Sequence, residues 1–123
     1  MSHVVTVAFT RSHVGDLDGA VTQRSGSWTA SVTAVVHDNG EGRVANAVVN
    51  GTWTIRGSGS PGSCTTNGAG ECTVSRASIP NGVRDVTFTV NTVAHPTLTY
   101  TAGESHDPDG DSNGKVIVVR RNP

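Results

Sequence analysis

Residues 106–115, HDPDGDSNGK, carry oxygen-bearing side chains on alternate positions of a segment that contains two glycines. Carboxylates stand at Asp107, Asp109 and Asp111, and an amide stands at Asn113. Side chains on every second residue of a loop can turn toward one ion, and Ca²⁺ accepts six to eight oxygen ligands at roughly 2.3–2.6 Å. The spacing therefore predicts a calcium site to which these four residues contribute.

A second acidic segment, HVGDLDGA at residues 13–20, has the composition of a turn and adds Asp16 and Asp18 as candidate ligands. Six of the ten acidic residues fall in these two segments or beside them, and such crowding is repulsive without a cation. We expect the two segments to meet around the ion. His13 and His106 each precede an acidic run, so either imidazole could donate a hydrogen bond to a ligating carboxylate.

The aspartate-rich segment is not an EF-hand loop. That loop requires a glycine at its sixth position and a bidentate acid at its twelfth, where this chain has Ser112 and Val118. The alternative to a metal site is a solvated turn, because Asp, Gly and Asn favour turns without any ion.

The only two cysteines, Cys64 and Cys72, flank the segment TTNGAGE, in which Asn67 and Gly68 form a strong turn signal. Pairing outward from that turn places the cysteines opposite each other on a hairpin, so we expect a disulfide that crosses the hairpin. Such a bond persists in an oxidising compartment. Two reduced thiols remain the alternative, and a zinc site is weaker because two further ligands at the usual spacing are missing.

The 123 residues suit one domain spanning 1–123, in which residues 1–3 read as added during expression. Alternation of apolar and polar residues predicts strands in WTASVTAVV, AVVNGTWTI, DVTFTV, LTY, KVIVV and, less regularly, VVTVAF. Trp28 and Trp53 fall on apolar faces, RGSGSPGS reads as a loop, and Gly51 leaves space for a large neighbour. Seven to nine short strands indicate an all-β sandwich with Greek-key connections, with a closed barrel as the alternative.

The order HVGDLDGA, WTASVTAVVHD, VANAVVNGTW, SCTTNGAGECTVS, VTFTV, LTY and HDPDGDSNG resembles bacterial immunoglobulin-like modules of large secreted or surface proteins. The likeness covers nearly the whole chain. It implies an immunoglobulin-like sandwich, an extracellular setting, an accessory role and neighbouring domains of the same polypeptide as partners. The hairpin position expected for the cysteines differs from the bond between the two sheets of antibody domains.

No catalytic motif is present, so we expect no enzyme. A net charge of −1 without a basic run speaks against nucleic acid, and no apolar stretch is long enough to span a membrane. We therefore expect a calcium-stabilised spacer, stabiliser or adhesion domain. The alternative is a carbohydrate-binding module that meets a polysaccharide or cell-surface ligand, with Tyr100 as the aromatic residue best placed to stack on a sugar.

Overall fold

The computed structural model describes residues 10–106 and 113–121 of the chain. Within them it contains eight β-strands and one short 3₁₀ helix. In chain order these are β1 (Arg11–Gln23), β2 (Ser27–Asp38), β3 (Val48–Ile55), β4 (Ser58–Thr65), β5 (Glu71–Pro80), β6 (Asp85–Ala94), β7 (Thr99–Tyr100), η1 (Ala102–Glu104) and β8 (Val116–Arg120).

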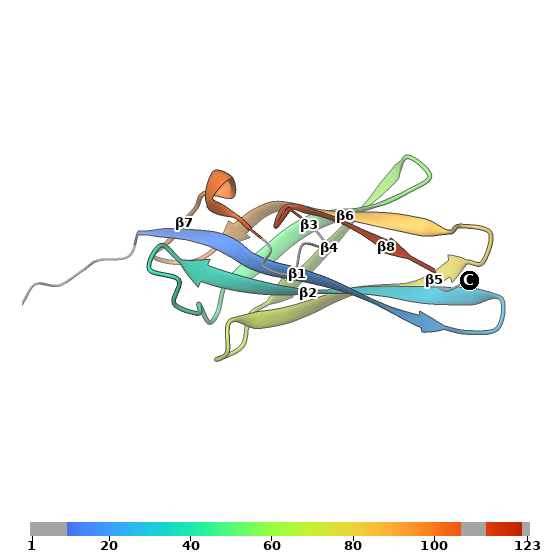
Figure 1. Cartoon of the computed structure of the whole chain (residues 1–123), viewed down its shortest axis with the longest axis horizontal. Helices are drawn as coiled ribbons and strands as arrows, with labels where there is room; N and C mark the ends of the chain where they lie inside the picture. The colour runs from blue at the N-terminus through green and yellow to red at the C-terminus, as the bar shows by residue number, and fades with distance from the viewer. Residues whose placement is uncertain (1–9, 107–112, 122–123) are drawn as a thin grey trace, which may run out of the picture.

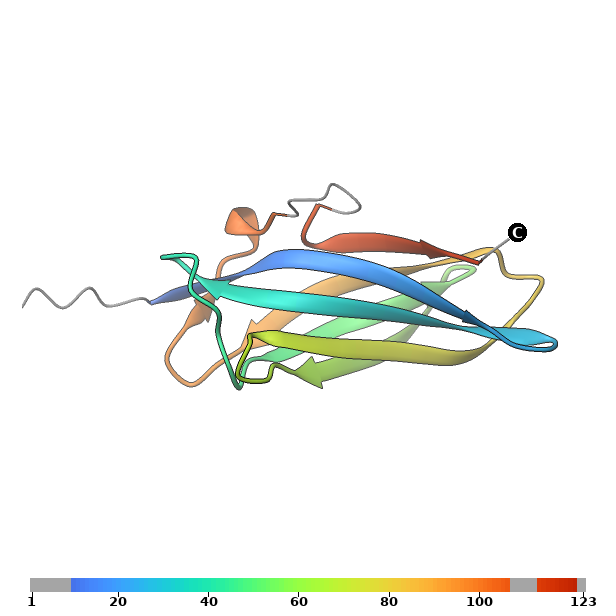
Figure 2. The same ribbon diagram turned by 60° about the horizontal axis from the view of Figure 1, so that its bottom comes forward.

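The strands form two four-stranded sheets, ordered β5-β2-β1-β7 and β4-β3-β6-β8. The two sheets pack face to face, and their long strands run along the long axis of the molecule (Figures 1 and 2). The chain changes sheet between β2 and β3, between β4 and β5, and at every later connection. Strands β2 and β5 therefore pair, as do β3 and β6, although each pair is far apart in sequence. This Greek-key arrangement confirms the predicted immunoglobulin-like sandwich.

The apolar residues of the alternating patterns predicted in β2 and β3 fill the space between the sheets. Trp28 and every second residue after it up to Val36 are buried, and Trp53 is buried on the facing sheet. A β-carbon built on Gly51 would lie 2.3 Å from the ring of Phe88, which in turn packs on Trp53 with ring centroids 4.9 Å apart. The small residue thus makes room for a large one, as the sequence predicted.

Two segments with the composition of turns are strands instead. Residues 13–20, expected to form an acidic turn, run through the middle of β1 and pair with β2. Residues 58–63 of the expected loop belong to β4, which pairs with β3 over its whole length. A β-carbon at Gly62 would lie 2.8 Å from Nε1 of Trp53, so this glycine serves close packing and not a turn.

The disulfide between Cys64 and Cys72 is present, but the expected hairpin is not. Cys64 pairs with Val49 on β3, whereas Cys72 pairs with Ala34 on β2, so the bond joins the two sheets. The connection crosses between the sheets through a turn at Asn67, whose backbone carbonyl accepts from Gly70 N at 2.9 Å. Cys64 on β4 and Cys72 on β5 lie on strands of different sheets, so the disulfide links the two sheets covalently.

Candidate metal centre

Three histidines and one glutamate converge at the end of the sandwich where β1 begins and β2 ends. His13 on β1 and His37 on β2 are register partners in the antiparallel pair. Gly15 lies in a register shift between Val14 and Asp16, and a β-carbon there would lie 2.3 Å from Nδ1 of His37. The glycine at this bulge therefore leaves the space that the His37 ring occupies.

Glu41 enters the cluster from the tight turn that follows β2. Asp38 organises this turn, because its Oδ1 accepts from the backbone amides of Gly40 and Gly42, each at 2.9 Å. Glu41 itself has φ 65°, a left-handed conformation that favours glycine. In that conformation its side chain reaches back to His37, four residues earlier, with Oε2 2.8 Å from Nδ1.

His106 enters from the segment that follows η1 and runs beside β1. Its backbone amide donates to the carbonyl of Val14 at 3.0 Å, and Val14 N donates to Oγ of the preceding Ser105 at 3.1 Å. Gly114, at φ 79°, also lies against it, because a β-carbon there would come 2.6 Å from His106 N. The backbone of His106 is thus held beside β1, one residue from His13.

The four side chains meet around the Glu41 carboxylate. His13 Nε2 lies 3.1 Å from Glu41 Oε1, and His106 Nε2 lies 3.2 Å from Oε2. Ring centroids of the three imidazoles are 5.1–6.0 Å apart. One ligand atom from each of the four residues lies within 4.8 Å of all the others.

Burial differs sharply within the cluster. The His13 side chain is 2% exposed, whereas those of Glu41 and His106 are 56% and 45% exposed. The 3.1 Å approach of His13 to Glu41 lacks hydrogen-bond geometry, so both ring nitrogens of His13 are buried without a hydrogen-bond partner among the described residues. Burying an imidazole whose nitrogens have no hydrogen-bond partner lowers the stability of the folded state, unless another group binds one of those nitrogens.

The cluster favours the ionised form of Glu41. Desolvation raises the pKa of this carboxyl, but the hydrogen bonds from His37 and His106 and the charges of His13 and His106 lower it below its usual value. An ionised carboxylate only accepts hydrogen bonds, so His37 Nδ1 and His106 Nε2 are the donors. The site therefore presents one anionic carboxylate among three imidazoles.

The structure places only three of the six residues predicted to bind calcium, and their role as calcium ligands stays a prediction. Asp107, Asp109 and Asp111 lie outside the described residues. Asp16 and Asp18 lie on β1 on either side of the buried Leu17, so both point to the opposite face of the strand from the core. Asn113 Oδ1 accepts from the amides of Lys115 and Val116, at 2.9 and 2.8 Å, and so closes the turn that leads into β8.

Tyr100, predicted as a free aromatic ring, is half-buried and packs against the hydrophobic core. Its hydroxyl oxygen is also buried. Trp28 and Trp53 are fully inside, and Trp28 Nε1 donates to the carbonyl of Val83 at 2.9 Å. The two tryptophans therefore offer no open ring face to a sugar, and Tyr100 exposes only part of its side chain.

Sequence reasoning singled out His13 and His106 but missed His37 and Glu41. The prediction gave the two histidines a supporting role beside carboxylates, whereas both side chains point at the same glutamate. One signal was present: His37 and Glu41 flank the turn DNG at a spacing of four residues. Without the strand register, nothing linked that pair to His13 or to His106.

Comparison with protein-family models, with curated proteins and with solved structures finds no significant match. The described part of the chain also contains no helix with the length and apolar character of a membrane span.

Proposed function

We propose that this chain is a non-catalytic, immunoglobulin-like module that acts as a spacer, stabiliser or adhesion domain within a larger secreted or surface protein. One observation carries the proposal. The described chain begins β1 at one end of the long axis and leaves β8 at the other (Figures 1 and 2). Neighbouring domains attached at these two ends are held apart by the length of the sandwich.

The strands set that length. β1 has 13 residues, and at about 3.3 Å per residue a strand of this length spans roughly 43 Å. The Cys64–Cys72 bond joins the two sheets and keeps them from separating. A disulfide of this kind suits an oxidising, extracellular setting, which is where a spacer of a secreted protein would work.

Calcium belongs to the proposal as a stabiliser. Asp16 and Asp18 share one face of β1, and Asp107, Asp109 and Asp111 follow directly after His106, whose backbone is bonded to β1. Oxygen ligands from both segments are the donors that Ca²⁺ prefers. Binding there would favour the folded state, because the unfolded chain cannot bring the two segments together.

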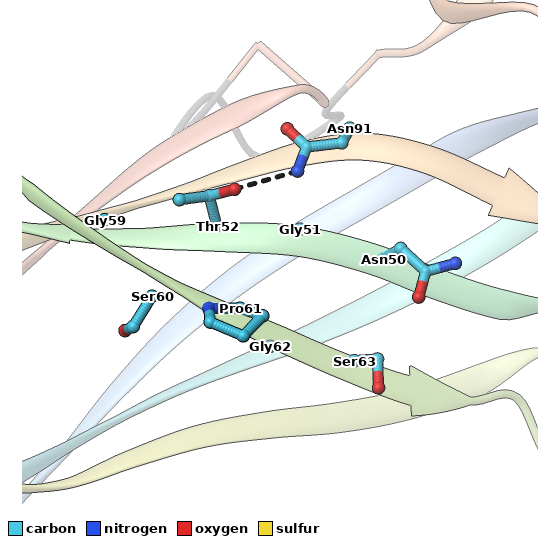
Figure 3. Close-up of a pocket in the computed structure, with 9 residues that line it drawn as sticks. All are labelled: Asn50, Gly51, Thr52, Gly59, Ser60, Pro61, Gly62, Ser63 and Asn91. Carbon is cyan, nitrogen blue, oxygen red and sulfur yellow. Dashed lines mark hydrogen bonds between the residues drawn. The ribbon is translucent and has the colours of Figure 1, made fainter.

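Nothing in the described residues favours the carbohydrate-binding alternative. A shallow hollow on the outer face of β3 and β4 is lined by asparagine, serine, threonine, glycine and one proline, and Asn91 donates to Thr52 Oγ1 there at 2.8 Å (Figure 3). It contains no aromatic ring, and both tryptophans are in the core. Titration with chitin, cellulose or xylan fragments should leave tryptophan fluorescence unchanged.

The spacer proposal is tested by measuring the distance across the module. Fluorescent donor and acceptor groups are attached through unnatural amino acids at Thr10 and Arg120, both exposed, so that the native cysteines stay paired. Single-molecule energy transfer should give one narrow distance distribution at roughly 35 Å, because Arg120 lies beside residues 19–21 of β1, about ten residues along the strand from Thr10. The same pair in denaturant with reductant provides the broad reference distribution.

A broad distribution under native conditions would contradict a rigid spacer. A narrow but short distance would place both attachment points at one end and would contradict the proposal equally. Either result leaves the disulfide and the sandwich intact, so it concerns the spacer role alone.

A further inference from the structure

We propose that His13, His37, Glu41 and His106 form a binding site for a divalent transition-metal ion, with Zn²⁺ as the best-suited occupant. This inference does not depend on the spacer role. It also differs from the calcium prediction, because none of the four residues was among the expected calcium ligands.

The donor set selects the class of metal. Three imidazoles and one carboxylate offer nitrogen-rich coordination, which suits Zn²⁺ and neighbouring ions of the first transition row. Ca²⁺ requires six to eight oxygen donors and gains little from imidazole. The four side chains therefore favour zinc over calcium by their chemistry alone.

The geometry is close to that of a tetrahedral site. Zinc holds imidazole nitrogen and carboxylate oxygen at about 2.0–2.2 Å, which separates neighbouring ligand atoms by roughly 3.3–3.6 Å. The three separations between imidazole nitrogen and carboxylate oxygen in the structure are 2.8, 3.1 and 3.2 Å. All four donors already lie within 4.8 Å of one another, so movements of about 1 Å in three partly exposed side chains complete the set. His37 Nδ1 and His106 Nε2 give up the protons that they donate to Glu41 when the ion binds.

His13 supplies independent support for a ligand. Its ring is buried, and neither nitrogen has a hydrogen-bond partner in the described parts of the chain. Nε2 nevertheless faces the Glu41 carboxylate at 3.1 Å in a direction unsuitable for a hydrogen bond. An ion placed among the four donors would give this buried nitrogen the partner that it lacks.

Four protein ligands make this a closed, structural type of site. Catalytic zinc sites keep three protein ligands and leave the fourth position to water. Here the ion would tie together β1, the turn after β2 and the segment after η1, which are far apart in sequence. Bound zinc would thus hold the end of the sandwich at which β1 begins.

The test uses the full chain, free of any histidine tag, after exhaustive chelation. Calorimetric titration with Zn²⁺ should give one site per chain, and a parallel titration with Co²⁺ should produce the intense visible absorption of a tetrahedral ion. Ca²⁺ added first should not abolish either signal, because its oxygen ligands are different residues.

Two exposed ligands provide variants that are expected to fold. H106A and E41Q should each weaken Zn²⁺ binding by more than the 10- to 100-fold that the loss of an outer-shell partner typically costs. The matched control is H95A, because His95 lies outside the cluster and its Nδ1 accepts from Thr97 N at 3.2 Å. H95A should bind Zn²⁺ as the unaltered chain does.

Any of the following results would overturn the assignment. The first is an unaltered chain that binds no Zn²⁺. The second is an H106A or E41Q variant with unchanged affinity. The third is a Co²⁺ spectrum typical of six-coordinate oxygen ligation, which would place the ion among carboxylates elsewhere. A lower melting temperature of H106A in chelator alone, without any metal effect on the unaltered chain, would mean that the cluster is only a hydrogen-bonded one.

Discussion

His13 and His37 face each other across the β1–β2 pair, with their ring centroids 5.7 Å apart and their planes nearly perpendicular. The bulge at Gly15 shifts the register between Val14 and Asp16, just past this pair, and leaves room for the His37 ring. The two strands thereby bring a buried imidazole and a half-buried one to the same end of the sandwich, where Glu41 and His106 meet them.

Replacing Gly15 by alanine should disturb this site specifically. The new β-carbon would lie 2.3–2.8 Å from three atoms of the His37 ring, so the ring must swing away. We expect Zn²⁺ affinity to fall at least about tenfold, as measured by calorimetry. Gly68→Ala is the control, because nothing lies within 4 Å of a β-carbon at that position. Equal affinities for the two variants would mean that His37 is not a ligand.

Glu41 holds a left-handed backbone conformation in the turn that follows β2. Glu41→Ala and Glu41→Gly both remove the carboxylate, but only glycine adopts φ 65° without steric cost. In metal-free buffer the glycine variant should therefore exceed the alanine variant in free energy of unfolding by about 1 kcal/mol. Denaturant titration measures the difference. An alanine variant as stable as the glycine variant would show that the turn relaxes when the carboxylate is lost.

The disulfide should contribute substantially to stability. Cys64 and Cys72 are eight residues apart, and closing a loop of this size constrains the unfolded chain by about 2–3 kcal/mol in the entropic model. The double variant Cys64→Ser/Cys72→Ser should lose that much free energy of unfolding in urea. The unaltered chain in excess reductant serves as the control and should match the variant. A much smaller loss would indicate that the paired sheets hold together without the bond.

Calcium binding remains a prediction with a test of its own. Asp109→Ala removes one of the alternating carboxylates and should weaken Ca²⁺ binding in calorimetry while leaving Zn²⁺ binding unchanged. The reason is that oxygen-rich and imidazole-rich sites draw on different residues. Chelation of calcium should also lower the melting temperature by several degrees. If Asp109→Ala keeps the affinity of the unaltered chain, the acidic segment is a solvated turn.

The sandwich could be predicted because burial on one face leaves a period-two pattern in the sequence. That pattern is clear in β2, where every second residue from Trp28 to Val36 is buried. Gly51 was recognised as a space for a large side chain, and Phe88 occupies it. Local alternation therefore identified most of the strands and the core.

The wrong predictions share one cause, because each concerned a feature that is set by contacts between residues far apart in the sequence. Glycines read as turn residues in fact permit close contacts between elements: Gly15 against His37 and Gly62 against Trp53. Local spacing also suggested a hairpin around Asn67, whereas long-range pairing sends Cys64 and Cys72 to different sheets. The metal cluster was hidden for the same reason, because strand register and not sequence proximity brings its members together.

The central structural claim is that one end of this sandwich is built to hold a divalent transition-metal ion. Anomalous X-ray scattering at the zinc absorption edge, from crystals grown with Zn²⁺, tests it most directly. We predict one peak about 2.0–2.2 Å from donor atoms of His13, His37, Glu41 and His106. No peak among these four side chains, or a peak bound only by aspartate oxygens, would contradict the claim.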